Sequence, residues 1–288
     1  MEKGKRDQGK LITVLRKGIR NRILSLLALV SLSPALQGQC VKSNTVFTGG
    51  EEAVYSVSYN WGPVWVNAGV VTFSASFETY HGIPAWHLKS TGKTFPSYDL
   101  LFKVRDYYDS WVDTSTFRSI GFQRYIYEGG YTLVNTLAFD YARQKVYSNT
   151  KTNNNSVRTD TLKLLPCTFD MLTAVYFTRL QDLSSLKPNE KKQVALIIDD
   201  CYYIIYIRSL GKEVVENTDG KKYRCIKFAA KMVTGTIFRG DEDVLVWVTD
   251  DANKIPIRVE AKILVGTVKA FLKEVKGIRN PMTTLIKE

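Results

Sequence analysis

The sequence contains few of the residues that form metal sites and catalytic sites. Among its 288 residues are 2 histidines and 4 cysteines, and the cysteines do not have the spacing of zinc ligands. The chain also lacks a G-x-S-x-G nucleophile motif, a phosphate-binding glycine loop and an H-E-x-x-H motif. No metal, no cofactor and no catalytic residue is therefore predicted.

The cysteines are Cys40, Cys167, Cys201 and Cys225. An oxidising compartment permits a disulfide, but the spacing does not determine which cysteines pair. Cys201 and Cys225 lie in predicted strands, where we expect them to be small, buried, apolar residues.

The chain also has no apolar run of about 20 residues, the length that spans a bilayer as a helix. Its N-terminal apolar run covers only residues 23–32. Eight Lys and Arg residues precede this run, and Ser33-Pro34-Ala35 follows it as a signal-peptidase site. Residues 1–35 are therefore predicted to be a signal peptide, which exports the chain to the periplasm or outer-membrane periphery of a Gram-negative bacterium. Lipid attachment at Cys40 is the minor alternative, because Gln39 stands where a lipoprotein signal has a small residue.

Part of the net positive charge of the chain lies in the predicted signal peptide. The chain has 40 basic and 28 acidic residues, of which residues 1–35 hold 8 and 2. The remainder has 32 basic and 26 acidic residues, without the dense basic stripe of nucleic-acid-binding proteins. Nucleic acid is therefore not an expected partner.

The sequence does contain regular alternation of apolar and polar residues. From residue 55 to residue 61 every second side chain is apolar or aromatic, which is typical of a strand with one buried face. Residues 202–207 are apolar on both faces, so that strand is either covered on both sides or lines an apolar cavity. Residues 149–161 are predicted to be an exposed loop. Further strands are predicted at residues 64–70, 71–77, 86–93, 102–113, 120–127, 131–141, 194–199, 201–208, 223–232, 243–249, 255–263 and 264–272.

One amphipathic helix is predicted over residues 168–180, with Thr168 as its N-cap. Strands in series with short connections imply antiparallel hairpins, and a sheet of about a dozen strands tends to curl or close. The expected fold is mainly β, a large antiparallel, strongly curled sheet or partly closed barrel with this one helix. The expected organisation is a signal peptide (1–35), a short linker (36–48), a single β-rich domain (49–275) and a C-terminal tail (276–288).

Five segments of the chain resemble a known family. They are GGEEAVYSVSYNWGPVWVNAG (49–69), FKVRDYYDSWVD (102–113), YEGGY (127–131), CTFDMLTAVYFTR (167–179) and WVTDDANKIPIRVEAKILVGTVKAFL (247–272). The resemblance is to family 3108 of the domains of unknown function, exported proteins of which many come from Bacteroides-like bacteria. It implies a β-rich envelope domain and brings no catalytic residues. At the level of fold, such a sheet is also similar to carriers of the lipoprotein-localisation type, which hold acyl chains, although fold does not imply function.

Two pairs of adjacent carboxylates, Asp199-Asp200 and Asp250-Asp251, have the composition of turns. Neighbouring residues of a strand point to opposite faces, so neither pair forms a catalytic dyad by itself. Both pairs are predicted to be structural, because Asp side chains bond to nearby backbone groups in turns.

The remaining candidates are a buried carboxylate and a set of aromatic residues. Asp106 lies on the apolar face of its strand, where we expect a buried ion pair with Arg124 or Arg179. Aromatic rings can line a groove for a lipid or other amphiphile. The candidate ligand-binding residues are Trp61, Trp65, Trp111, Tyr203 and Trp247.

Three functions fit these features. The first is non-enzymatic binding of a lipid or other amphiphile in an apolar groove of the curled sheet, and the missing catalytic motifs favour it. The second is a structural or assembly partner in the envelope, recognisable by a broad apolar patch. The third is a carboxylate-dependent hydrolase of envelope polysaccharide that uses residues such as Asp106 and Asp251. Peripheral membrane association is compatible with export.

Overall fold

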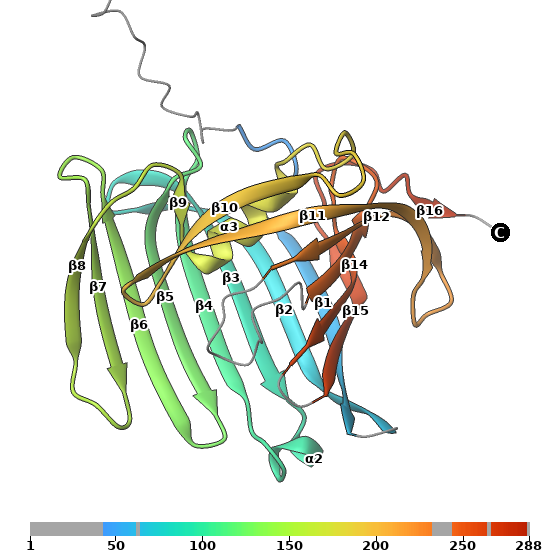
Figure 1. Ribbon diagram of the computed structural model, residues 1–288, viewed down its shortest axis with the longest axis horizontal. Coiled ribbons are helices and arrows are strands. Elements are labelled where there is room, and N and C mark those ends of the chain that lie inside the picture. The colour runs from blue at the N-terminus through green and yellow to red at the C-terminus, as the bar shows by residue number, and fades with distance from the viewer. Residues whose placement is uncertain (1–42, 62–63, 232–243, 264–265, 287–288) are drawn as a thin grey trace, which may run out of the picture. The chain divides into compact units, whose positions relative to one another are not determined.

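The computed structural model describes residues 43–61, 64–231, 244–263 and 266–286, with Trp61 described by its backbone alone. The predicted signal peptide and Cys40 lie outside the described residues. The chain is mainly β, as predicted, and its strands join one large sheet (Figure 1). Within the described ranges, neither helix is long and apolar enough to cross a membrane.

The first half of the sheet is an antiparallel meander in which each strand pairs with the next along the chain. The short helix α2 (Pro96–Asp99) lies between the third and fourth strands. The strands are β1 (Glu51–Trp61), β2 (Val64–Tyr80), β3 (Ile83–Thr94), β4 (Arg105–Asp113), β5 (Ser119–Glu128), β6 (Tyr131–Asp140), β7 (Lys145–Thr152) and β8 (Arg158–Lys163).

The second half continues the same sheet from the other side of β1, which pairs antiparallel with β15. Helix α3 (Met171–Arg179) precedes β10, and β9 pairs with β10 in parallel. The strands are β9 (Thr168–Phe169), β10 (Lys191–Ile198), β11 (Cys201–Glu216), β12 (Lys222–Ala230), β13 (Val244–Thr249), β14 (Pro256–Lys262), β15 (Thr267–Lys276) and β16 (Leu285–Ile286), the last pairing with β12.

The order of the strands forces the sheet to curl. β8 and β9 stand at the two ends of the strand order, yet only residues 164–167 connect them. A connection of this length spans at most about 17 Å, so the two ends of the sheet lie near each other. Contacts from the β10–β11 turn join them: Asp200 forms an ion pair with Arg158 of β8, and the Ser148 hydroxyl of β7 donates a hydrogen bond of 2.7 Å to the Asp199 carbonyl. Among the described strands, β8 and β9 do not pair, so the sheet is curled and not closed.

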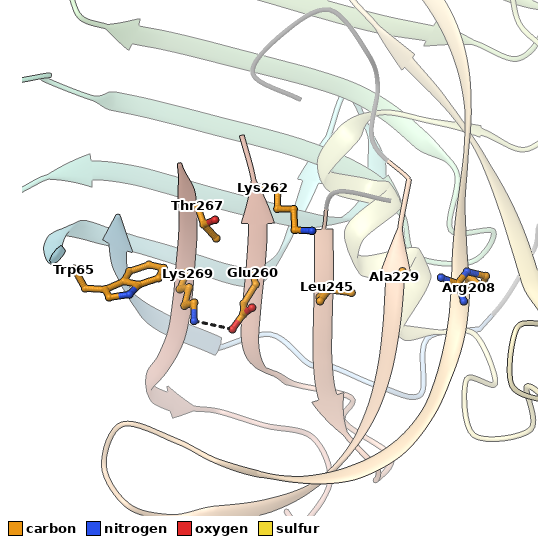
Figure 2. Close-up of a pocket in the computed structure, with 8 residues that line it drawn as sticks. All are labelled: Trp65, Arg208, Ala229, Leu245, Glu260, Lys262, Thr267 and Lys269. Atoms are coloured by element: carbon orange, nitrogen blue, oxygen red, sulfur yellow. Dashed lines mark ion pairs between the residues drawn. The ribbon is translucent and has the colours of Figure 1, made fainter. Parts of the chain in front are cut away.

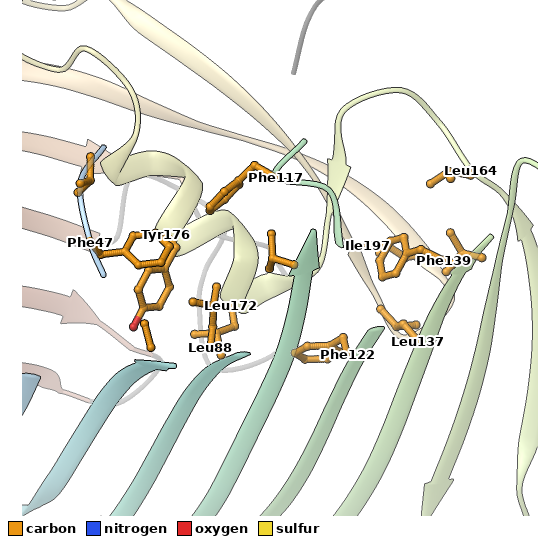
Figure 3. Close-up of a cluster of buried hydrophobic side chains, with 14 residues drawn as sticks. Phe47, Leu88, Phe117, Phe122, Leu137, Phe139, Leu164, Leu172, Tyr176 and Ile197 are labelled. Atoms are coloured by element: carbon orange, nitrogen blue, oxygen red, sulfur yellow. The ribbon is translucent and has the colours of Figure 1, made fainter. Parts of the chain in front are cut away.

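Helix α3 packs against the inner face of the meander (Figure 3). Its residues Leu172 and Tyr176 belong to the largest buried cluster, which includes Ile197 of β10 from the other half of the sheet. The residues that the meander strands contribute to this cluster are Ala75, Leu88, Val112, Phe122, Leu137, Phe139 and Val146. The helix therefore fills the space that the curl of the sheet encloses.

The first residue of this helix was predicted incorrectly. Thr168 and Phe169 form β9, and Asp170 is the N-cap, because its carboxylate accepts a hydrogen bond of 2.8 Å from the Thr173 backbone amide. Helical spacing also predicts that Val175 shares the buried face with Leu172 and Tyr176, but Val175 is 46% exposed. The helix presents a narrower buried stripe than expected.

The predicted loop at residues 149–161 is also wrong, because most of it belongs to the β7–β8 hairpin. Beyond Val146, the next inward residues of β7, Ser148 and Thr150, are polar, so the apolar alternation that marks a strand is missing there. Buried Asn135 of β6 makes this arrangement stable, because its amide donates to the hydroxyls of Ser148 and Thr150 at 3.3 and 2.9 Å.

The segments on either side of the predicted domain take part in the fold. Val46 and Phe47, in the expected linker, are 2% and 0% exposed and belong to the largest core cluster. In the expected tail, β16 adds a short strand beside β12.

The cysteines differ in their environments. Cys225 is buried in β12 as expected, whereas Cys201 is exposed because it directly follows the β10–β11 turn. Both are free thiols, and Cys167 is disulfide-bonded.

Candidate functional site

A groove of about 350 Å³ crosses strands β11 to β15 (Figure 2). Its lining residues are Trp65, Arg208, Ala229, Leu245, Glu260, Lys262, Thr267 and Lys269. Five of them form one row of directly opposed residues across five strands, in the order Lys269, Glu260, Leu245, Ala229 and Arg208. Opposed residues project from the same face of a sheet. The row therefore has an apolar centre with charged side chains at both ends.

The groove lies on the outer face of this half of the sheet. Side chains alternate between faces along a strand, so the residues next to the row point the other way. Phe228 and Val244, which flank Ala229 and Leu245, are buried in a cluster that also contains Leu183 from the segment after α3. The inner face is thus filled by core side chains, and the groove faces away from them.

Trp65 forms one end of the groove. It lies in β2 near the β1–β2 hairpin tip and is 45% exposed. The Lys269 ammonium lies 4.6 Å from the centroid of its ring, a cation–π contact. Of the four predicted ligand-binding residues whose side chains the structure describes, Trp65 is the one that lines this groove.

The groove has an excess of positive charge. Among the described lining residues are Arg208, Lys262 and Lys269, with Glu260 as the one carboxylate. Partial burial alone raises the pKa of Glu260, but hydrogen bonds from Arg258 and Lys269 outweigh this effect and hold that pKa below its usual range. Glu260 therefore stays ionised, and its 3.2 Å ion pair with Lys269 fixes the position of the Lys269 ammonium.

Trp247 lies in the neighbouring row of the same face, and it is 4% exposed. Lys227 and Arg258 each place their charge 4.8 Å from the centroid of its ring, and its indole nitrogen donates to the Glu213 carboxylate. Trp247 therefore supports the sheet beside the groove. It was predicted to bind a ligand, but its ring is buried and cannot contact one.

The other predicted ligand-binding residues lie elsewhere. Trp111 of β4 stacks between Tyr80 and His87, with centroids 4.4 and 4.9 Å away. Tyr203 packs against a buried cluster formed by β9, β10 and α3. Trp61 is in β1, and its side chain lies outside the described residues. The aromatic content of the sequence did not show which aromatic residues line the groove and which pack elsewhere. The row of opposed residues that contains Leu245 and Arg208 was not predicted.

The predicted ion pair of Asp106 with Arg124 or Arg179 is wrong. Arg124 forms an ion pair with Asp199, and Arg179 pairs with Glu51 at 2.6 Å. These partners come from distant segments, which the curl of the sheet brings together. The residues next to each partner in the sequence do not indicate which distant residue it pairs with.

Asp106 is nevertheless buried, as predicted, with 9% exposure. Its carboxylate accepts a hydrogen bond of 3.3 Å from the Tyr127 backbone amide. Burial, with a further contribution from the nearby Glu128 carboxylate, raises the pKa of Asp106 to about 7.

The turn carboxylates all make contacts that hold the fold. Asp199 and Asp200 pair with Arg124 and Arg158, and Asp250 pairs with Lys212 at 2.8 Å. Asp251 accepts hydrogen bonds on both oxygens, from Thr249, Asn253 and Lys254 on one and from Thr283 and Thr284 on the other.

These contacts leave Asp251 committed to the β13–β14 turn, whereas Asp106 lies in β4. The arrangement offers no support for a hydrolytic pair of these two carboxylates. In the part of the chain that the structure describes, no group of three His, Cys, Asp or Glu side chains is placed to hold a metal ion.

Comparison with known proteins agrees with this description of the fold. A crystal structure from Brucella abortus, of a beta-barrel-like protein of the domain of unknown function DUF1849, is similar with a TM-score of 0.52 and 9% sequence identity. The match covers 82% of this chain and 100% of that chain, and it shows a shared fold alone. No match to a curated protein is found. The profile of the family described as "Protein of unknown function (DUF3108)" matches residues 54–273, and the chain belongs to this family.

Proposed function

We propose that the chain is an exported, non-enzymatic protein of the cell envelope that binds an anionic amphiphile in the groove of strands β11 to β15. The observation that carries the proposal is the row with an apolar centre, Leu245 and Ala229, between charged ends, in a lining that also contains Lys262. An acyl chain suits the apolar centre, and an anionic head group suits the cations. The exposed ring of Trp65 adds a further apolar contact at one end.

The size of the groove limits what it holds. Its volume of about 350 Å³ is near the lower end of the roughly 300–1,000 Å³ usual for ligand sites. A single short chain or one segment of a longer chain fits that space. Because Lys269 is paired with Glu260, Lys262 is the lining residue that we expect to attract the anion.

The proposal of export has separate support. The basic segment, the apolar run at residues 23–32 and the small residues after it have the order of a secretory signal. A disulfide at Cys167 is also typical of proteins in oxidising compartments.

Binding can be measured by calorimetry with dihexanoyl phosphatidylglycerol below its critical micelle concentration. We expect binding of this lipid and weaker binding of dihexanoyl phosphatidylcholine, which has no net charge. Lys262→Gln is expected to weaken binding by roughly 3- to 10-fold, the effect of one exposed charge contact. Leu245→Asp should abolish binding, because it places a carboxylate in the apolar centre.

The matched control is Lys89→Gln, which removes another exposed lysine, from β3, where it is paired with Asp109. Its affinity should equal that of the unchanged protein. Equal affinity of the Leu245→Asp variant, or no binding of either lipid by the unchanged protein, would remove the proposal.

A further inference from the structure

Three consecutive large apolar residues are exposed in the connection between β3 and β4. Leu100, Leu101 and Phe102 have exposed fractions of 91%, 62% and 48%. Single exposed apolar residues are common on soluble proteins, but a contiguous set marks a contact surface for another molecule.

The exposure of these residues results from a well-braced turn. The Leu101 backbone amide donates a hydrogen bond of 2.9 Å to the Tyr98 carbonyl at the end of α2. Below the turn, the Asp99 carboxylate pairs with Arg105 at 2.5 Å. Leu100 and Leu101 therefore protrude from a fixed support.

A second apolar tip lies at the same end of the sheet. The start of β2 contains Val64, Trp65 and Val66, with exposed fractions of 58%, 45% and 37%. This end of β2 continues beyond the pair of Gly69 with Thr94, and Thr94 is the last residue before the β3–β4 connection. In Figure 1, α2 and the β1–β2 hairpin accordingly lie at the same edge.

Cations accompany these apolar tips. Residues 93–105 contain Lys93, Lys103 and Arg105 against Asp99 alone, an excess of two positive charges. Lys93 and Lys103 are exposed, and Lys93 stands opposite Arg105 across the two strands. Near the second tip, Lys269 lies over the Trp65 ring. The edge thus combines protruding apolar side chains with basic residues directly behind them.

We propose that this edge docks the protein on the surface of an anionic lipid bilayer, with Leu100 and Leu101 inserted among the lipids. Apolar side chains gain free energy in the acyl region, and Lys and Arg are attracted to anionic head groups. Separate protruding tips suit a bilayer, which closes around each of them, whereas stable protein interfaces bury continuous complementary patches. This docking goes beyond the groove ligand and does not depend on it.

The test is co-sedimentation of the mature chain with vesicles. Vesicles of phosphatidylethanolamine and phosphatidylglycerol should bind the protein, and vesicles of phosphatidylcholine alone should bind it weakly. The double variant Leu100→Ser, Leu101→Ser is expected to lower the partition coefficient by about tenfold or more, because two apolar side chains no longer enter the bilayer. The matched control is Val175→Ser, which removes an exposed apolar side chain on α3.

The outcomes separate this proposal from the groove. A double variant that loses vesicle binding but still binds soluble dihexanoyl phosphatidylglycerol supports docking by the edge. Vesicle binding by the double variant equal to that of the unchanged protein overturns docking, as does a failure of the unchanged protein to bind anionic vesicles. If the double substitution instead dissolves an oligomer seen by size-exclusion chromatography, the edge is a protein interface and the proposal is wrong.

Discussion

Arg179 of α3 and Glu51 of β1 form a buried, two-pronged ion pair, with N–O distances of 2.6 and 3.0 Å. Their side chains are 9% and 3% exposed. The same guanidinium donates hydrogen bonds of 3.2 and 3.0 Å to the Asn253 carbonyl. One side chain therefore joins the helix, the first strand and the β13–β14 turn.

Glu51→Gln is expected to lower the free energy of unfolding by roughly 3–5 kcal/mol, because it leaves the Arg179 charge buried without its partner. Urea unfolding followed by tryptophan fluorescence measures this loss. Glu52→Gln is the control, since Glu52 pairs with Lys276 at 2.8 Å in an exposed setting. A similar loss for both variants would show that the buried pair has no special role.

Asp170→Ala should also destabilise the fold. The buried Asp170 carboxylate accepts hydrogen bonds from the Ser110 and Ser119 hydroxyls at 2.5 and 2.6 Å, and from Thr173 at the start of α3. Removing it deletes the helix cap and leaves buried donors without partners, so we expect a loss of about 3 kcal/mol in urea unfolding. Asp182→Ala removes an exposed turn carboxylate and should have a much smaller effect; a loss as large as that of Asp170→Ala would contradict the assignment.

Asp106 gives the stability of the protein a dependence on pH. Its pKa is about 7 in the folded chain and near 3.8 in the unfolded chain. Between these values the folded state binds more protons at Asp106 than the unfolded state, so the contribution of Asp106 to stability is greatest below about pH 4 and is lost as the pH rises towards 7. The Glu128 carboxylate adds to the shift, whereas Arg124 and the Tyr127 amide oppose it.

Asp106→Asn removes the titrating group and keeps the shape of the side chain. We expect the difference in unfolding free energy between the variant and the unchanged protein to grow in favour of the variant from about pH 4 to about pH 7, by at most roughly 4 kcal/mol. Thermal unfolding across this range measures the difference. A constant difference would mean that Asp106 is already ionised at low pH in the fold.

Two glycines with positive φ provide a matched test of packing. A Cβ added at Gly277 would lie 2.1 Å from the Gly50 carbonyl oxygen, at φ +63°. At Gly220, with φ +79°, a Cβ meets no atom within 4 Å. We expect Gly220→Ala to lose about 1 kcal/mol from backbone strain and Gly277→Ala to lose about 3 kcal/mol or more, because the chain must also shift. Equal losses of unfolding free energy for the two variants, measured in urea, would contradict the close approach of Gly277 to Gly50.

The two free thiols should differ in reactivity. Cys201 is exposed, whereas burial raises the pKa of the Cys225 thiol to about 12. Because the thiolate is the reactive form, iodoacetamide at about pH 8 should modify Cys201 and leave Cys225 unmodified in the folded protein. Peptide mass spectrometry identifies the modified residue. Rapid modification of Cys225 would show that β12 is accessible.

Local patterns predicted the elements of this fold well. Alternation from residue 55 to residue 61 indicates β1, and helical spacing after residue 168 indicates α3, because each pattern reflects contacts of one segment with one buried face. The β7–β8 hairpin escaped prediction because two inward residues of β7, Ser148 and Thr150, are polar and bond to Asn135.

The pairing of side chains was far less predictable. Glu51 and Arg179 are 128 residues apart, and Arg124 and Asp199 are 75 apart. Such partners depend on how the sheet curls, which no local pattern contains. The groove has the same origin, since its apolar centre arises only when five strands align in register.

The pairing of β1 with β15 has a consequence for when the chain can fold during its synthesis. The two strands lie near opposite ends of the sequence, so their ladder, at the middle of the sheet, cannot form until nearly all of the polypeptide has been synthesised. Contacts between such remote segments also make folding slow. A newly made chain of this topology therefore lacks the ladder that joins the two halves of its sheet until synthesis has passed β15.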